Sequence, residues 1–308
     1  MRTVKCKIGW AALVSLIAFV ACERDFDIKI RNNEPQLVVE AYINNLMPTF
    51  NYVILSKSKN YYEPGFQNTP VGGAKVYITE GELSADNKYR WDETSTRELR
   101  EISLLQVRNS PASGVYFDPR LVTDSANALR GKPGKHYLLE IEAEGKKYTA
   151  TTALLIPVPV DSLSTGNYFV DEDDNHDTMT KARITVYFKD PDTIGNTQLY
   201  YWRHGGIRNN FGWGGLGANW YTPGTDELVN GQHIKITHSY GFVIGDTVEY
   251  FMANVERKVY NFWDSFNKAR DNGGPFATPV SLLNTINGEN VTGCFSGFSL
   301  STRNIIVK

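Results

Sequence analysis

A mainly β protein is predicted by three features of the sequence. Aromatic residues make up 12% of the chain, which also contains 26 Gly and 13 Pro, a composition typical of strands joined by turns. Short β-branched runs alternate with turn-forming residues over most of the length, and a clear helical period occurs near residues 256–270. We therefore predict an N-terminal immunoglobulin-like β-sandwich over residues 36–156, followed by a second antiparallel β-rich domain over 157–308 with one amphipathic helix.

Length and charge agree with this organisation and disfavour several classes of protein. A chain of 308 residues is long enough for two domains, or for one large all-β domain. Hydrophobic residues are 41% and charged residues 21% of the chain, as in ordinary globular proteins, so disordered and fibrous classes are not expected. The formal net charge is −2 and no basic block occurs, so binding to nucleic acid is not expected either.

The first domain is predicted from strand patterns bounded by turns. These patterns lie at residues 36–43, 52–56, 71–79, 114–117, 132–144 and 147–152. The last two are joined at Gly145 as in a hairpin. Pro157 and Pro159 bias their predecessors toward extended geometry, so residues 156–161 form a stiff exit and mark the domain boundary.

The second domain contains further strand patterns and the helix. The strands are expected at residues 163–170, 183–189, 197–203, 233–237 and 246–252. The helix carries its apolar side chains at 3–4 spacing and ends before Gly273, so its aromatic stripe is expected to pack on a sheet. Residues 171–177 hold five acids, which favours a solvated hairpin tip over a Ca²⁺ loop because the glycine turn and distal glutamate of an EF-hand are missing.

The first 21 residues have the organisation of a lipoprotein signal peptide. Arg2, Lys5 and Lys7 precede an uncharged apolar run over residues 8–21, which is shorter than the ~20 residues of a transmembrane helix. Residues 19–22 (FVAC) fit a lipobox, in which the thiol of Cys22 is acylated with fatty acids such as palmitate and the preceding peptide bond is cut. The alternative is an ordinary signal peptide with an incidental cysteine.

The segment after the lipobox indicates where the protein is displayed. Residues 22–35 form a polar tether with acids at Glu23, Asp25 and Asp27, which resembles the surface-export tag of Bacteroidota lipoproteins. Exposure on the cell surface is therefore favoured over a periplasm-facing anchor. After processing, Cys294 is the one remaining thiol, so no disulfide framework or cysteine metal site is expected and this thiol is predicted to be buried.

Several pieces of sequence resemble one uncharacterised family of Bacteroidota lipoproteins, domain of unknown function 4249. Besides Cys22 with its acidic follow-on, they are residues 35–42 (PQLVVEAY), 71–76 (VGGAKV), 151–161 (TTALLIPVPVD), 186–191 (VYFKDP) with Asn196 and Tyr200–Tyr201, the helix, 272–279 (NGGPFATP) and 293–299 (GCFSGFS). The resemblance implies an outer-membrane lipoprotein, often associated with TonB-dependent transporters, and supplies no catalytic residues. This chain departs from the pattern at Cys294, where an aromatic or bulky residue is commoner.

Motifs of known enzymes are missing from the sequence. It contains no GxSxG elbow, HExxH pair or P-loop. The histidines are scattered, and His233 and His238 are five apart in a strand-like segment, which places them on opposite faces. We therefore expect no enzymatic activity, no cofactor and no metal.

The strongest candidate for a binding surface is the glycine-rich segment 202–231. About 25 residues without obvious regular structure inside a compact domain are usually functional or disordered, and the aromatic content favours order. Its rings and cations could bind a peptide, a glycan or a partner protein, although the alternative that the rings only cap the fold remains open. The candidate binding residues are Trp202, Arg203, Arg208, Phe211, Trp213, Trp220 and Tyr221, and a weaker aromatic cluster lies at residues 60–66.

Two functions compete at this level. The first is a non-catalytic accessory lipoprotein that binds a nutrient or docks on a TonB-dependent transporter of the outer membrane. The alternative is a structural or adhesive lipoprotein of the cell envelope with no transport role. An enzyme ranks third.

Overall fold

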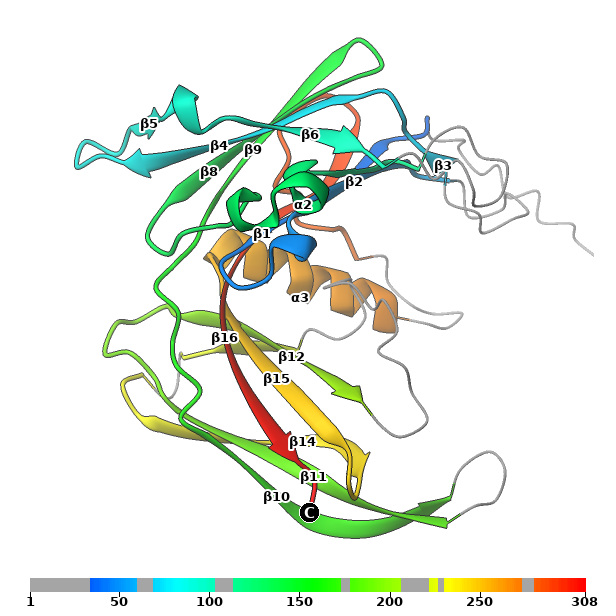
Figure 1. Ribbon diagram of the computed structural model, residues 1–308, viewed down its shortest axis with the longest axis vertical. Coiled ribbons are helices and arrows are strands. Elements are labelled where there is room, and N and C mark those ends of the chain that lie inside the picture. The colour runs from blue at the N-terminus through cyan, green and yellow to red at the C-terminus, as the bar shows by residue number, and fades with distance from the viewer. Residues whose placement is uncertain are drawn as a thin grey trace, which may run out of the picture. The chain divides into compact units, whose positions relative to one another are not determined.

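The structure is a computed structural model that describes residues 34–59, 69–102, 113–172, 178–205, 222–226, 230–272 and 280–308. Contacts divide the chain into residues 1–34 and one compact unit, Pro35–Lys308. All the elements described below belong to the second unit (Figure 1). The signal peptide, Cys22 and the tether as far as residue 33 lie outside the described residues, as do the aromatic cluster at 60–66 and the acids at 173–177.

The prediction of a mainly β protein is confirmed. The strands of the first half are β1 (Leu37–Asn44), β2 (Tyr52–Lys57), β3 (Thr69–Pro70), β4 (Lys75–Leu83), β5 (Tyr89–Trp91), β6 (Arg97–Glu101), β7 (Val115–Phe117), β8 (His136–Ala143) and β9 (Lys146–Ala153). Those of the second half are β10 (Ser162–Glu172), β11 (Thr178–Lys189), β12 (Thr197–Gly205), β13 (Thr222–Thr225), β14 (His233–Val243), β15 (Thr247–Asn254) and β16 (Val291–Ile306). The helices are α2 (Arg120–Thr123), α3 (Arg257–Asp271) and the 3-10 turns η1 (Pro48–Phe50), η2 (Glu93–Ser95) and η3 (Ser125–Asn127).

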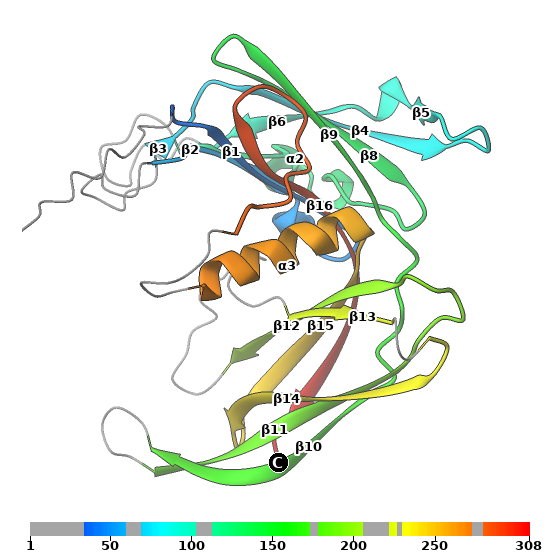
Figure 2. The same ribbon diagram turned by 180° about the vertical axis from the view of Figure 1, so that it is seen from behind.

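The described strands form two sheets (Figures 1 and 2). The larger has the order β13-β12-β15-β16-β1-β2-β7-β6-β4-β8-β9, with β3 beside β2 and β5 beside β4. The smaller contains β10, β11 and β14, with β11 in the middle. Neighbouring strands are antiparallel except β1 and β16, which are parallel.

Strand β16 joins the two halves of the larger sheet. Its residues 291–298 pair with β1, and its residues 299–306 pair with β15. The strand is buried from Gly293 to Leu300, on both of its faces. A strand buried on both faces loses the apolar–polar alternation of a surface strand, and β16 accordingly uses Gly, Ser and Cys beside Phe.

Three layers of apolar side chains surround this framework. The first core lies among β1, β2, β4, β8 and β9 and contains, for example, Leu55, Ile78, Leu139 and Phe295. The second lies between α3 and the sheet at β12, β15 and β16. The third separates β12–β15–β16 from the three-stranded sheet, where Val186, Phe188, Tyr250 and Phe242 are buried.

Helix α3 confirms the helix predicted near residues 256–270. Its apolar stripe packs on the second core through Val259, Phe262 and Trp263, and Trp263 Nε1 donates a hydrogen bond of 3.0 Å to Ser296 Oγ of β16. Cys294 beside it is a free, buried thiol, as predicted, and burial raises its pKa to about 11. Among the described helices, none has the length and apolar character needed to cross a membrane.

The immunoglobulin-like arrangement predicted for residues 36–156 is not confirmed. The strands of this region surround one core, but β16, from the far end of the sequence, completes that core and lies beside β1. The predicted boundary at residue 156 falls between β9 and β10. Strands from before and after residue 156 nevertheless belong to one sheet. Strand β16 joins them, because it runs from the first core to the third and pairs with β15 there.

Replacing Gly293 with alanine tests the importance of β16. Gly293 has φ +144°, and a Cβ there would lie 1.9 Å from the carbonyl oxygen of Val39 on β1. We expect Gly293→Ala to lower the free energy of unfolding by at least about 3 kcal/mol, because both backbone strain and a backbone clash oppose it. Urea denaturation of the purified chain measures this change.

Gly166→Ala is the matched control. Gly166 lies in β10 with no atom within 4 Å of the added Cβ and no left-handed φ. The free energy of unfolding of the Gly166→Ala variant should stay within about 0.5 kcal/mol of the parent value. Equal effects of the two substitutions would contradict a special requirement at Gly293.

Candidate functional site

A proline-containing connector forms one side of the candidate site. Residues 154–161 link β9 to β10, and Pro157 and Pro159 have no N–H group with which to join a strand ladder. Side chains of β15 and β16 hold the segment instead. Asn254 Oδ1 accepts the N–H of Val158 at 3.0 Å, and the hydroxyl of Ser301 donates to the carbonyl of the same residue at 2.6 Å. Ser299 donates to the carbonyl of Leu155 in the same way.

The turn between β11 and β12 forms the other side. Asp226 is 1% exposed and organises this turn, because its carboxylate accepts the N–H groups of Gly195 and Asn196 at 2.9 and 3.0 Å. Gly195 has φ +99°, a conformation that favours glycine. Asp190, at the start of the turn, accepts the N–H of Gly231 at 3.1 Å. The chain therefore turns between the two strands that were expected at residues 183–189 and 197–203.

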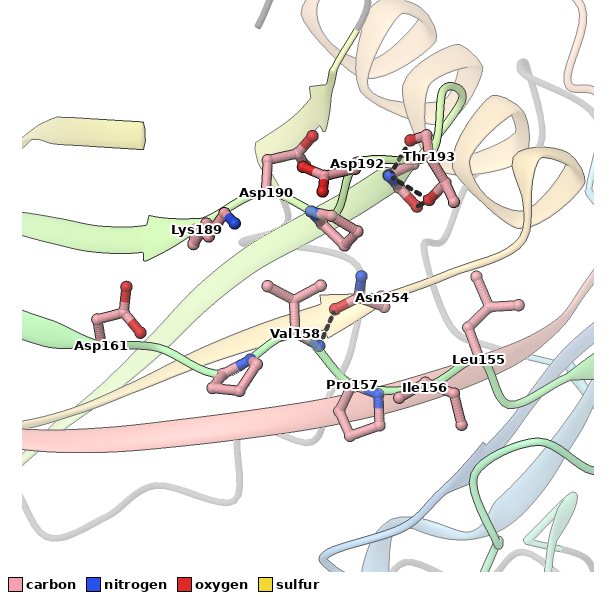
Figure 3. A pocket seen from close by; sticks show the side chains of 13 residues that line it. Leu155, Ile156, Pro157, Val158, Asp161, Lys189, Asp190, Asp192, Thr193 and Asn254 are labelled. Carbon is pink, nitrogen blue, oxygen red and sulfur yellow. Dashed lines mark hydrogen bonds between the residues drawn. The ribbon is translucent and has the colours of Figure 1, made fainter. Parts of the chain in front are cut away.

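Between the connector and the turn lies a cleft of about 610 Å³ (Figure 3). The volume is within the range typical of small-molecule sites. Figure 3 shows Ile156, Pro157 and Val158 on one side, Lys189, Asp190 and Thr193 on the other, and Asn254 between them. The lining consists of Leu155, Ile156, Pro157, Val158, Pro159, Asp161, Lys189, Asp190, Pro191, Asp192, Thr193, Asn196 and Asn254.

The cleft combines an apolar side with an acidic rim. The lining contains three aspartates and one cation: Asp161, Asp190, Asp192 and Lys189. It therefore carries an excess of two negative charges when all four are ionised. Burial raises the pKa of Asp190, and the nearby carboxylate of Asp226 raises it further. The hydrogen bond from the Gly231 N–H lowers it. The side chain of Gln198 lies beside this carboxyl, and its hydrogen bond also opposes the rise in pKa. The arrangement suits a ligand with an apolar body and N–H donors or a positive charge.

The buried carboxylates beside the cleft bind backbone N–H groups. In the part of the chain that the structure describes, no group of three or more His, Cys, Asp or Glu side chains is arranged to hold a metal ion. Asp226 uses its oxygens for backbone N–H groups. The cleft can position and recognise a ligand through shape, apolar contact and hydrogen bonds.

Two of the binding residues predicted from the sequence are described, and they point in opposite directions from β12. Trp202 packs in the third core, with ring-centroid distances of 5.0 Å to His238 and 5.7 Å to Phe242. Arg203 lies on the other face, where its guanidinium pairs with the carboxylate of Glu249 and lies 5.2 Å from the ring centroid of Phe251. Neither residue lines the cleft.

The remaining predicted site residues lie outside the described residues. They are Cys22, Arg208, Phe211, Trp213, Trp220 and Tyr221. The strand expected at residues 197–203 is present and extends to Gly205 as β12. About 25 residues of segment 202–231 were expected to lack regular structure, but Thr222–Thr225 forms β13 beside β12. Backbone pairing with β12 can recruit even a short segment that contains Pro223 and Gly224.

The cleft was not predicted as a site, although a signal for it was present. Both of its sides, residues 151–161 and 186–191 with Asn196, are pieces through which the sequence resembles the DUF4249 family. They are separated by two strands in the sequence, and only the fold brings them together.

Acid should destabilise the protein through His238, next to Trp202. His238 is 7% exposed, its Nε2 lies 2.9 Å from the hydroxyl of Tyr250, and burial lowers its pKa to about 4 from 6.5. The unfolded chain therefore binds this proton at a higher pH than the folded chain. The corresponding stability is complete above pH 6.5 and disappears as the pH falls toward 4, a loss of about 3 kcal/mol.

Urea denaturation between pH 7 and pH 4 measures this loss, with His238→Gln as the comparison. The variant should show a shallower pH dependence than the parent, while the carboxylates and other histidines titrate alike in both. Parallel pH profiles would contradict the assignment to His238.

Comparisons with known proteins place the chain in a family. No curated protein matches it. Among solved structures, it is similar to red sea bream transglutaminase (TM-score 0.23, 9% identity, 90% of this chain), of which it spans about a third (32%). It is similar also to a DUF3823 family protein from Bacteroides uniformis ATCC 8492 (TM-score 0.22, 10% identity, 89% of this chain and 100% of that one). The model of the domain of unknown function DUF4249 matches residues 23–304, so the chain belongs to that family.

Proposed function

We propose that this protein is a non-catalytic lipoprotein of the outer membrane, exposed on the cell surface, that serves as an accessory binding component of a TonB-dependent nutrient-uptake system. The observation that carries the proposal is the cleft between residues 155–161 and 189–196. It is built from two family-like segments, and it offers apolar surface and acidic hydrogen-bond acceptors at one place. Such a combination serves recognition of a ligand or partner.

The N-terminal sequence supports the lipid anchor. The basic start, the apolar run over residues 8–21 and the FVAC motif precede the family match, which begins at residue 23, directly after Cys22. A lipidated cysteine followed by a polar tether would leave the whole family domain outside the bilayer. A single anchored chain of this kind can act beside a transporter without crossing the membrane itself.

The chain enters the compact unit at the start of β1, away from the cleft. At the start of β1, Gln36 donates its N–H to Ser58 Oγ at 2.8 Å, and Asn290 donates to the carbonyl of Pro35 at 3.2 Å. Figure 1 shows this start of β1 beside β3, whereas β10, β11 and β14 lie at the other end of the unit. The cleft borders that distant sheet through Asp161 and Lys189.

Changing Cys22 to alanine tests the anchor. We expect Cys22→Ala to abolish labelling with radioactive palmitate and to remove the protein from the outer-membrane fraction, because the acceptor thiol is gone. Cys6→Ala, which changes a cysteine within the signal peptide, should leave both properties intact. Persistent palmitate label in the Cys22 variant would contradict lipidation at this residue.

A charge placed in the cleft tests the binding role. Ile156 is 71% exposed at the cleft, and Val122 is 81% exposed on α2, so each accepts aspartate without loss of core packing. We expect Ile156→Asp to reduce recovery of a TonB-dependent transporter with the tagged chain by at least tenfold, a change of about 1.4 kcal/mol. Affinity capture from native outer membranes with mass spectrometry gives the measurement.

Val122→Asp is the control and should recover the transporter as the parent does, with both variants melting near the parent temperature. Recovery of no TonB-dependent transporter by the parent chain would overturn the transport role and favour the structural or adhesive alternative. Equal recovery by both variants would overturn the cleft as the contact.

A further inference from the structure

A two-faced hairpin extends from the first half of the larger sheet. Strands β4 and β5 form it, and β5 pairs with β4 at its outer end through Gly81–Trp91 and Leu83–Tyr89. Both views show the hairpin projecting away from the other strands (Figures 1 and 2). It lies in a different part of the sheet from the cleft.

Strand register places the apolar side chains of this hairpin on the face opposite the first core. Val76 and Ile78 of β4 point into that core. Because side chains alternate along a strand, Gly81 and Leu83 lie on the other face, and their partners Trp91 and Tyr89 lie there with them. His136 of β8 completes the row, since it pairs with Gly81. We name Leu83, Tyr89, Trp91 and His136 the aromatic platform.

The other face of the hairpin is charged. Glu82 pairs with Arg90 across the two strands, and its carboxylate binds the ammonium group of Lys135. An ordinary surface strand turns its apolar side chains toward the core and its charged side chains toward solvent. In this hairpin the charged side chains lie on the face that continues the core face, and the aromatic side chains lie on the opposite face. Clusters of exposed apolar side chains are found at interaction sites more often than elsewhere on a protein surface.

The rings of the platform are held in fixed positions. Tyr89 and Trp91 stack with centroids 4.9 Å apart and an interplanar angle of 16°, and Tyr89 meets the His136 ring edge-on at 5.3 Å. Trp91 covers Gly81, where an added Cβ would lie 2.4 Å from its Cε3. Tyr89 nevertheless remains 40% and Leu83 43% exposed. A preorganised, exposed ring surface loses little side-chain entropy when a ligand covers it.

Size and charge narrow the class of ligand. Four side chains are too few for a stable protein interface, which buries about 800 Å² and 20–30 residues on each side. The platform contains no Asp, Glu, Lys or Arg, and burial lowers the pKa of His136. A flat, uncharged ring surface fits the C–H face of a neutral sugar ring, and the phenol hydroxyl of Tyr89 can exchange hydrogen bonds with sugar hydroxyls.

We propose that the aromatic platform is a binding site for neutral polysaccharide, in which a sugar ring stacks on the exposed face of the Tyr89 ring and Trp91 supports the Tyr89 ring from its other side. Contact with a single ring is weak, and repeated sugar units on one polymer strengthen it by avidity. The site is independent of the cleft, so its presence does not depend on a transporter.

Native affinity electrophoresis of the detergent-solubilised full chain tests the site. The gels contain amylopectin, arabinoxylan, galactomannan or mixed-linkage β-glucan, with the anionic polygalacturonate as a charge control. We expect at least one of the four neutral polymers to retard the parent chain. Tyr89→Ala and Trp91→Ala should each weaken that retardation at least tenfold, and Tyr89→Phe should retain it.

Tyr168→Ala is the matched control, since Tyr168 is an aromatic residue on β10 that is 59% exposed and outside the platform. It should bind as the parent does. Because Trp91 also covers Gly81, Tyr89→Ala decides the test if Trp91→Ala lowers the melting temperature. Three results would overturn the proposal: no retardation by any neutral polymer, retardation by polygalacturonate alone, or unchanged binding of Tyr89→Ala.

Discussion

The parallel pairing of β16 with β1 is the interaction on which the other parts of the structure depend. Residues 291–298 of β16 close the first core beside β1, and residues 299–306 carry β15 and the sheet beyond it. Close approach at its edges requires small residues. A Cβ on Gly297 would lie 2.5 Å from the carbonyl oxygen of Ala153, just as a Cβ on Gly293 would strike Val39. Two segments from distant parts of the sequence therefore meet in one strand pair, and the first core is incomplete without either of them.

The same strand also positions the cleft. The connector to β10 cannot pair as a strand at its prolines, so its carbonyl groups are bound by side chains of β16, among them Ser299, Ser301 and Arg303. Hydroxyl groups on a buried strand would be costly without partners, and the connector supplies those partners. The polar composition of β16 and the extended connector thus explain each other.

Much of the fold could be predicted from the sequence because surface strands and the helix have simple periods. The hairpin β8–β9, strand β11 and helix α3 all show them. β16 was not predicted, although it is the longest strand described, because burial on both faces removes alternation and its Gly and Ser residues resemble those of a loop. Periodicity within a segment also carries no information about a parallel partner more than 250 residues away.

The candidate sites were harder to predict, for a related reason. Aromatic content drew attention to segment 202–231, but Trp202 and Arg203 are neighbours in a strand and cannot face the same ligand. The cleft depends on two segments that are distant in sequence. Local composition identifies residues that can bind, whereas convergence is a property of the tertiary fold.

The β4–β5 hairpin shows the same limit most clearly. The alternation Tyr89–Arg90–Trp91 is that of any half-buried strand, and on its own it would place both rings in a core. Only the pairing with Gly81 and Leu83 reveals that the rings lie on the opposite side. Leaving a large apolar side chain exposed forgoes about 1.5–3 kcal/mol of burial energy, which the stacking of the two rings offsets only in part. A fold with three well-packed cores can tolerate this cost, and the side on which the rings lie is therefore best explained by what binds them.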